Sequence, residues 1–319
     1  MRAFIFPGQG SQAVGMGVAL ADASAVAREV FGEVDEALGQ NLRRLMAEGP
    51  ADELTLTENA QPAIMTNAIA TLRVLTREGG VTLSGKADYV AGHSLGEYSA
   101  LCAAEALDLS TTARLLKLRG RAMQAAVPVG EGAMAALLGA DVEKAQVIAG
   151  AAVDSILAEG GAELVCTVAN DNDPSQVVIS GHRVAVERAV ALAKEMGAKR
   201  AVLLPVSAPF HCPLMEDAAR AMEAALADAD LRAPLVPVFA NVDAAAVADP
   251  GAIRALLVEQ VTGRVRWRES VLAMVAAGVT EFVEFGGKVL SPMVKRIAPD
   301  AEATSVVSMD DIEALLKKM

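Results

Sequence analysis

The sequence predicts an α/β protein whose core is a parallel sheet, with a small domain inserted into that core. Short apolar runs alternate with helical patterns over residues 1–131, and the alternation resumes over residues 206–319. Between them the order changes to β-α-β-β-α-β, which is the ferredoxin-like arrangement. We therefore expect a core of residues 1–131 and 206–319 and a ferredoxin-like small domain of residues 132–205.

The first part of the core is expected to hold two strands and several helices. Apolar runs predict strands at Phe4–Phe6 and Asp88–Ala91. Apolar residues at helical spacing predict helices over Gln12–Leu38, Pro62–Leu75, Leu95–Leu107 and Ser110–Ala126.

The small domain and the rest of the core follow the same logic. Strands are predicted at Ala133–Leu138, Leu164–Val168, Gln176–Ser180 and Ala201–Pro205, with helices starting at Asp141 and His182. After Pro209, further strands of the core are predicted near Val236–Ala240, Glu281–Glu284 and Ser305–Val307.

Composition excludes several classes of protein. Of the 319 residues, 53% are hydrophobic and 21% charged, which is typical of a globular protein. The formal net charge of −12 disfavours nucleic-acid binding, which needs clustered cations. No uninterrupted apolar run could span a membrane and no signal pattern opens the chain, so we expect a cytoplasmic protein. The three cysteines show no metal-ligand spacing, which favours a reducing compartment.

The first loop, FPGQGSQA, fits three interpretations. Gly8, Gly10 and Ala13 match the G-x-G-x-x-G/A fingerprint of dinucleotide binding. That motif requires a second strand carrying an acid, and helical sequence follows here instead. The glycines could make a tight turn only, or the backbone amides of the turn could bind an anion formed during a reaction.

A serine nucleophile is predicted at Ser94. The stretch DYVAGHSLGEYSAL places G-x-S-x-G between an apolar strand and a helix, the context in which that motif forms a nucleophile elbow. Gly92 and Gly96 would let the strand and helix backbones approach closely. The amide of Leu95 would then point to where an oxyanion forms.

Only three histidines can serve as the base that a serine needs. His93 adjoins Ser94 and their side chains should diverge, and His182 starts a predicted helix, where a surface role fits. His211 lies in the rigid loop SAPFHCPLM, so we assign it as the base, while Cys212 should face away from it.

No third member of a triad is evident. Asp171 and Asp173 lie between Ser94 and His211 in chain order, but their stretch, ANDNDPSQ, has the composition of a turn. A backbone carbonyl that orients the imidazole would give a dyad instead.

One arginine is expected on the apolar face of a predicted helix. In the helix Ser110–Ala126, Arg119 falls within the apolar stripe, whereas Arg114, Lys117 and Arg121 occupy the solvent side. A buried cation needs a partner. That partner is either a structural carboxylate or a carboxylate of the substrate, which a guanidinium grips in a bidentate manner.

Six motifs carry a resemblance to a known family. Over residues 1–298 the chain resembles the malonyl-CoA:acyl carrier protein transacylases of fatty acid synthesis, on FPGQGSQ, TENAQPA, GHSLGEYSAL, RGRAMQ, SAPFHCPLM and KVLSPMVKRI, in this order. The resemblance implies an α/β-hydrolase-like core with a ferredoxin-like insert. It also implies that Ser94 is acylated, His211 is the base and Arg119 binds the malonyl carboxylate.

Further site residues are implied by the resemblance alone. The amides of Gln9 and Leu95 would form the oxyanion hole, and the carbonyl of Gln260 would orient His211. Gln61, His93 and Phe210 would contact the substrate, with Phe210 excluding a branched methylmalonyl group.

The implied activity is transfer of malonyl from malonyl-CoA to acyl carrier protein by a monomer, without metal or cofactor. A serine hydrolase or thioesterase is the alternative, because it would use the same elbow. Carrier proteins of this pathway are acidic, so docking needs a basic patch, for which the candidates are Arg183, Arg188, Lys194, Lys199, Lys288 and Arg296.

Overall fold

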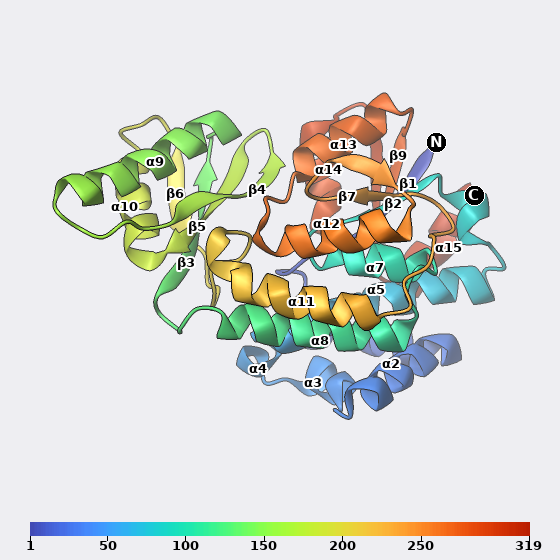
Figure 1. Ribbon diagram of the computed structural model, residues 1–319. Coiled ribbons are helices and arrows are strands. Elements are labelled where there is room, and N and C mark those ends of the chain that lie inside the picture. The colour runs from blue at the N-terminus through green and yellow to red at the C-terminus, as the bar shows by residue number, and fades with distance from the viewer.

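Two sheets organise the protein, for which the computed structural model describes all residues 1–319 (Figure 1). The larger sheet has six strands in the order β10-β9-β1-β2-β7-β8. All neighbours pair in parallel except β7 and β8 at the edge. The second sheet has four antiparallel strands in the order β4-β5-β3-β6. The predicted α/β class with a parallel sheet is confirmed.

The strands and helices occur close to the predicted positions. The strands of the larger sheet are β1 (Arg2–Phe6), β2 (Tyr89–Gly92), β7 (Val238–Ala240), β8 (Ala245–Val247), β9 (Glu281–Phe285) and β10 (Glu302–Val306). Those of the smaller sheet are β3 (Gly132–Leu138), β4 (Cys166–Asp173), β5 (Gln176–His182) and β6 (Arg200–Leu203).

The helices fall into three groups along the chain. Before the small sheet come α1 (Val18–Ala23), α2 (Ala25–Leu38), α3 (Leu42–Glu48), α4 (Ala51–Thr55), α5 (Thr57–Arg73), the π-helical turn η1 (Val74–Glu78), α6 (Leu83–Lys86), α7 (Gly96–Ala103) and α8 (Leu109–Ala125). Within it lie α9 (Val142–Ala158) and α10 (Arg183–Ala193). After it come η2 (Pro213–Met215), α11 (Glu216–Asp228), α12 (Pro250–Thr262), α13 (Trp267–Ala276), α14 (Leu290–Ile297) and α15 (Met309–Lys318).

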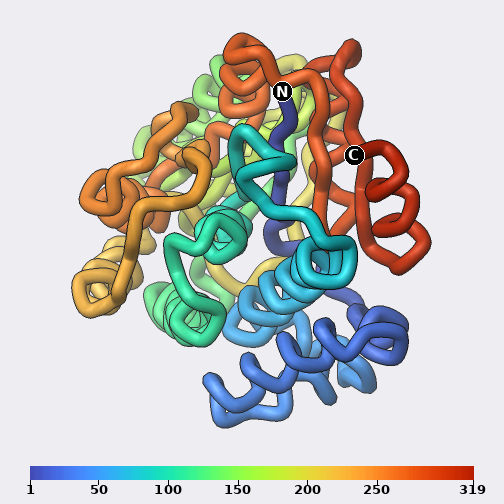
Figure 2. Tube along the Cα trace, turned by 90° about the vertical axis from the view of Figure 1, so that its right-hand side faces the viewer, coloured from blue at the N-terminus to red at the C-terminus, as the bar shows by residue number.

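Strand β1 runs through the centre of the larger sheet and is buried on both faces. Phe4 and Phe6 pack into a core of 61 buried residues on one face. Ala3 and Ile5 point to a separate core on the other face, around Trp267. This two-sided burial is why the run AFIF is apolar throughout instead of alternating. Figure 2 shows this N-terminal strand inside the molecule and the C-terminal helix α15 at its outer side.

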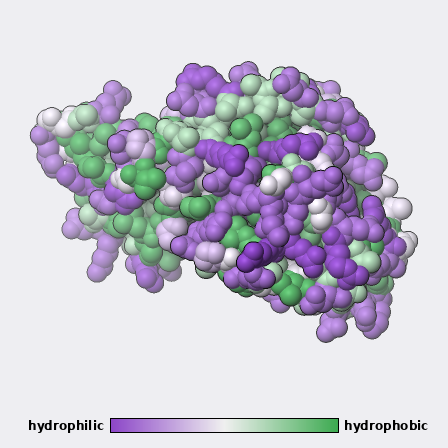
Figure 3. All heavy atoms as spheres, turned by 90° about the horizontal axis from the view of Figure 1, so that it is seen from below, coloured by the Kyte–Doolittle hydropathy of each residue, from purple (hydrophilic) through white to green (hydrophobic).

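The small sheet has its own core, made where β3 and β5 pack against α9 and α10. It stands at one end of the molecule in Figure 1. We call the rest of the protein, which is built around the six-stranded sheet, the larger unit. In the face seen in Figure 3, hydrophobic atoms reach the surface at the end formed by the small sheet, whereas hydrophilic atoms dominate over the larger unit. None of the helices combines the length and the apolar character that crossing a lipid bilayer requires.

Two local predictions are wrong. The helix predicted from Gln12 begins only at Val18, because Gly15 and Gly17 adopt positive φ and hold the preceding segment as a series of turns. The predicted turn around Asp171 and Asp173 is instead the end of strand β4. Tertiary ion pairs, described below, hold these residues in the strand despite their turn-like composition.

Candidate active site

The predicted strand–turn–helix context surrounds Ser94. Strand β2 ends at Gly92 and α7 begins at Gly96, and Ser94 between them has φ of 54°. A Cβ atom at Gly92 would lie 1.9 Å from the carbonyl carbon of Gly96, and one at Gly96 would lie 2.2 Å from the carbonyl oxygen of Phe6. Only glycine fits either position, so the two glycines let the chain turn tightly and project the serine.

The structure brings Ser94 and His211 together from residues far apart in sequence. The hydroxyl Oγ of Ser94 lies 2.7 Å from Nε2 of His211. Nδ1 of the same ring lies 2.9 Å from the backbone carbonyl oxygen of Gln260, so Nδ1–H donates there and Nε2 is free to accept. His211 is buried and itself has a positive φ of 57°. The arrangement is a dyad oriented by a carbonyl.

The electrostatic environment keeps the imidazole neutral. Burial, reinforced by the Arg119 cation, lowers the pKa of His211 to about 3. A neutral ring can accept the serine proton, which a protonated ring could not.

The competing candidates have structural partners. Nε2 of His93 lies 2.8 Å from Oδ1 of Asn172, and Nδ1 of His182 accepts a hydrogen bond from the amide of Val165 at 2.8 Å. The thiol of Cys212 donates to the carbonyl of Pro209, and burial raises its pKa. None of the three forms a hydrogen bond with the Ser94 hydroxyl.

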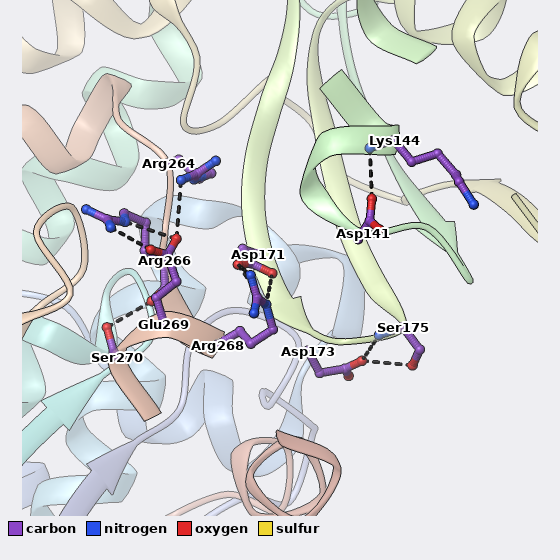
Figure 4. A network of polar contacts seen from close by, with 10 residues as sticks. All are labelled: Asp141, Lys144, Asp171, Asp173, Ser175, Arg264, Arg266, Arg268, Glu269 and Ser270. Carbon is purple, nitrogen blue, oxygen red and sulfur yellow. Dashed lines mark hydrogen bonds and ion pairs between the residues drawn. The ribbon is translucent and has the colours of Figure 1, made fainter. Parts of the chain in front are cut away.

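Asp171 and Asp173 do not serve as a third triad member. Asp171 Oδ2 lies 2.9 Å from Nη2 of Arg268, and Asp173 Oδ2 lies 2.8 Å from Nη2 of Arg296. Figure 4 shows Asp171 and Arg268 pointing toward one another between β4 and α13. These carboxylates join the small sheet to the helices of the larger unit.

The first loop lies against the elbow with free amides. A Cβ atom at Gly8 would lie 2.6 Å from the carbonyl oxygen of His93, so the glycine allows this approach. The amides of Gln9 and Leu95 donate to no group within the protein, and both residues line the same cavity as Ser94. Two unpaired amides beside a nucleophile can receive an oxyanion.

Arg119 is buried beside the nucleophile without an acidic partner. Its side chain is 1% exposed. Nη1 donates to Oε1 of Gln61 at 2.9 Å, and Nη2 donates to Oε1 of Gln260 at 2.9 Å and to Oγ of Ser94 at 3.2 Å. Nε has no partner. Because every acceptor is neutral, the structural-carboxylate alternative fails at the level of direct contact.

The prediction for a neighbouring cation is wrong. Lys117, expected on the solvent side of α8, is only 9% exposed. Its Nζ lies 3.2 Å from Oε2 of Glu58 and donates to the side chains of Gln40 and Asn59. Helices α2 and α5 both pack on α8 and cover this position, which the periodicity of α8 alone does not reveal.

A cavity of about 300 Å³ connects these groups. All the predicted substrate contacts, Gln61, His93, Arg119 and Phe210, line it together with Ser94 and His211. Apolar side chains of both units complete the wall, namely Met123, Met134, Val178, Leu204 and Val206. The cavity therefore lies between the small sheet and the larger unit.

Two polar residues beneath the elbow escaped the sequence interpretation. Asn241, after β7, accepts from the amide of Ser94 at 2.7 Å and donates to the carbonyl of Gly92 at 2.7 Å. Glu97, in the first turn of α7, accepts from the amide of Asn241 at 3.0 Å. Asn241 follows an ordinary short strand and carries no motif. Glu97 could have been suspected only from its place on a fully buried helix.

The six candidates for a basic patch differ in their ion pairing. Arg183, Arg188 and Arg296 form ion pairs with carboxylates of this chain. Of the six candidates, Lys194, Lys199 and Lys288 form none.

A half-buried serine whose hydroxyl lies 2.7 Å from a buried histidine, at a strand–turn–helix bend, has the geometry of a serine nucleophile site on an α/β fold. The family described as acyl transferase domain matches residues 3–287, and the chain belongs to this family.

Named relatives match nearly the whole chain. The chain is 44% identical over 318 residues to the malonyl CoA-acyl carrier protein transacylase of Bacillus subtilis (strain 168), covering 99% of this chain and 96% of that protein. The crystal structure of acyl-carrier-protein-S-malonyltransferase from Bartonella henselae matches with a TM-score of 0.94 at 52% identity, covering 99% and 98% of the two chains. A type II PKS acyl-carrier protein in complex with its malonyl-transacylase matches with a TM-score of 0.93 at 38% identity, covering 100% and 99%.

Proposed function

We propose that this protein transfers malonyl from malonyl-CoA to the phosphopantetheine thiol of acyl carrier protein, through a malonyl ester on Ser94. The observation that carries the proposal is Arg119, a buried cation 3.2 Å from the Ser94 hydroxyl whose hydrogen-bond acceptors are all neutral. A carboxylate at the far end of a short acyl group would give the Arg119 guanidinium an ionic partner and accept hydrogen bonds from it. The names of the relatives support the same substrate pair.

Acylation begins with the dyad. His211 accepts the Ser94 proton at Nε2 as the serine oxygen attacks the malonyl thioester carbon. The amides of Gln9 and Leu95 stabilise the resulting oxyanion, a contribution of about 3 kcal/mol for one donor. When the carbon–sulfur bond breaks, the imidazolium returns the proton to the departing thiolate of coenzyme A.

Arg119 couples selection of the acyl group to the strength of the base. Its charge contributes to lowering the pKa of His211. A malonyl carboxylate on the guanidinium offsets that charge, so the pKa of His211 rises when the correct acyl group is bound. An uncharged acetyl group produces no such rise.

Deacylation repeats these steps with a different nucleophile. The carrier thiol gives its proton to His211 and attacks the malonyl ester, and the ester oxygen recovers the proton when Ser94 is released. The two halves share one cavity, which is the structural basis for a ping-pong sequence.

We assign the larger unit, residues 1–131 and 206–319, as an α/β-hydrolase-like core and residues 132–205 as a ferredoxin-like domain. The elbow at the end of β2 supports the first assignment, and the strand order β4-β5-β3-β6 with helices α9 and α10 supports the second. The three buried free cysteines are consistent with a reducing cytoplasm.

Intact-protein mass spectrometry after mixing with malonyl-CoA tests the function. The wild type should gain one malonyl group and lose it on addition of holo acyl carrier protein, which becomes malonylated. Ser94→Ala should gain none. The control is Ser99→Ala on α7, the helix that follows Ser94. It removes a buried hydroxyl that has no hydrogen-bond partner, and it should react as the wild type does. Rapid release of free malonate without a carrier would favour a hydrolase instead.

A further inference from the structure

Glu97 is a buried carboxyl group that the steps above do not use. It lies in the first turn of α7, directly after the elbow, and is 1% exposed. Its Oε2 accepts hydrogen bonds from the amide of Asn241 at 3.0 Å and from Nε2 of Gln260 at 2.8 Å. Both donors are neutral, so Glu97, like Arg119, is a buried ionisable group without a direct ionic partner.

Gln260 joins these two groups. Its Oε1 accepts from Nη2 of Arg119 at 2.9 Å, while its Nε2 donates to Glu97 and, at 3.1 Å, to the carbonyl of Ser94. Turning the amide over would place its NH₂ against the guanidinium and its oxygen against the carboxylate, so both contacts fix its orientation. One amide therefore separates the cation from the carboxyl group.

The separation of Glu97 from Arg119 by one amide meets two opposing requirements of a buried cation that binds a substrate. A carboxylate in direct contact with Arg119 would occupy the donors that an acyl carboxylate needs, whereas a buried cation with no anion nearby would be costly. A carboxyl group one amide away lowers that cost and leaves the guanidinium open. Burial raises the pKa of Glu97 and lowers that of Arg119, and the charge of each group partly offsets the shift of the other.

We propose that Glu97 is the indirect counter-ion of Arg119, and that it takes up one proton from solvent when a substrate carboxylate binds the guanidinium. The inference rests on the proposed function, since it requires a charged acyl group. The proton enters the carboxyl group as the Arg119 charge becomes paired with the substrate, so the net charge of the buried site stays unchanged.

The surroundings of Glu97 permit such a change near neutral pH. Burial raises the pKa of Glu97 to about 7. The charged groups that act on it are Arg119 of α8, which lowers its pKa, and Asp243 beyond β7, which raises it. Tyr98 on the same helix stays neutral because burial raises its phenol pKa above the working range, and His211 is neutral as well.

The sign of the pH dependence follows. At pH values above the pKa that Glu97 has in the enzyme without substrate, binding of a malonyl carboxylate must draw a proton from solvent, so this binding weakens as pH rises. At pH values below that pKa, Glu97 is already protonated and malonyl binding is independent of pH. Between pH 6 and 8.5 malonyl acylation should therefore fall about tenfold relative to acetyl acylation.

The test measures initial rates of acylation by malonyl-CoA and acetyl-CoA between pH 6 and 8.5, using intact-protein mass. Taking their ratio cancels the pH effects shared by both coenzyme A esters. The wild type should show the tenfold fall. Glu97→Gln keeps an oxygen acceptor for Asn241 and Gln260 but cannot titrate, so its ratio should be flat. Glu48→Gln, an exposed control, should behave as the wild type.

A ratio that falls equally in the wild type and Glu97→Gln, or in neither, would overturn the inference while leaving the proposed function intact. Absence of any malonyl adduct in the wild type would overturn both. Proton uptake on malonylation, measured calorimetrically in two buffers of different ionisation enthalpy, requires no variant. The released coenzyme A thiol ionises partly at pH 8 in both reactions, so the acetyl-CoA reaction supplies the baseline. About one more proton taken up per malonyl group than per acetyl group supports the inference, and equal counts contradict it.

Discussion

Two regions of this molecule bury charged side chains, and they treat them in opposite ways. At the end of β4, Asp171 and Asp173 are each 1% exposed in their side chains and meet Arg268 and Arg296 directly, at 2.9 and 2.8 Å. Beside the elbow, Arg119 is equally buried, but its hydrogen bonds go only to amide and hydroxyl oxygens, and its guanidinium lies over the neutral ring of Tyr98. Directly paired charges join two parts of the protein, whereas a charge held by neutral groups stays available to a ligand.

Strand β4 shows how closely the two uses can be combined. Asn170 and Asn172 line the cavity, and the alternating Asp171 and Asp173 face the helices of the larger unit. The backbone continues this contact, because the amide of Asp171 donates to the carbonyl of Val265. One strand thus presents a neutral wall to the substrate and a charged face to its support.

Replacing Arg119 should produce the largest effect. Arg119→Ala removes charge-assisted hydrogen bonds to the acyl carboxylate, so malonyl acylation should fall about 10²–10³-fold and acetyl acylation less than about tenfold. Rates of adduct formation with the two coenzyme A esters check this. Equal losses for both esters would show that the arginine supports the fold of the site and does not select the acyl group.

A carboxylate placed next to Arg119 should turn the site beside the elbow into a directly paired one, like the ion pairs at the end of β4. Gln61→Glu places a carboxylate where Oε1 of Gln61 now accepts from the guanidinium at 2.9 Å. Competition with the substrate should reduce malonyl acylation about tenfold or more, while the melting temperature stays the same or rises. The matched control is Gln124→Glu, which adds the same charge on α8 at a position C-terminal to Arg119. An unchanged malonyl rate in Gln61→Glu would show that a directly paired Arg119 still binds the acyl carboxylate, and that its neutral partners are not what keeps it available.

The paired region should respond in stability and not in selectivity. Asp171→Asn leaves Arg268 without its partner, and because that arginine is 31% exposed we expect a loss of about 1–3 kcal/mol in unfolding free energy. Denaturant unfolding measures it. The pair of Glu159 and Arg188 supplies the control, because its carboxylate is 63% exposed, whereas that of Asp171 is 1% exposed, and Glu159→Gln should change nothing resolvable. A large shift in the malonyl-to-acetyl ratio of Asp171→Asn would show that the regions are not separate.

The smallest effect concerns the apolar wall. Phe210 precedes His211 in the chain and lines the cavity at 7% exposure. Phe210→Ala should raise methylmalonyl acylation relative to malonyl by about tenfold, the value of one methyl group in an apolar pocket. A competition assay with both esters measures this ratio, and an unchanged ratio would remove Phe210 from the selection of the acyl group.

The sequence predicts the parts of this site that depend on local geometry. Gly92, Ser94 and Gly96 form a short continuous motif, and the periodicity of α8 places Arg119 on its buried face. Contacts over long sequence separations could not be reached in this way. The burial of Lys117 depends on α2 and α5, and the strand conformation of Asp171 depends on an arginine 97 residues away.

The contrast between the two regions also explains why Asn241 and Glu97 were missed. Neither has a chemical signature of its own, because each acts by holding another group. Asn241 fixes the backbone of Ser94, and Glu97 reaches Arg119 only through Gln260. Such roles become visible only when the hydrogen-bond network is known.

A crystal structure of the protein malonylated on Ser94 would show whether the donors of Arg119 are reserved for the acyl carboxylate. We expect both carboxylate oxygens to lie within hydrogen-bonding distance of the guanidinium nitrogens. A carboxylate turned toward the mouth of the cavity, with Arg119 still bound only to Gln61, Gln260 and Ser94, would contradict it.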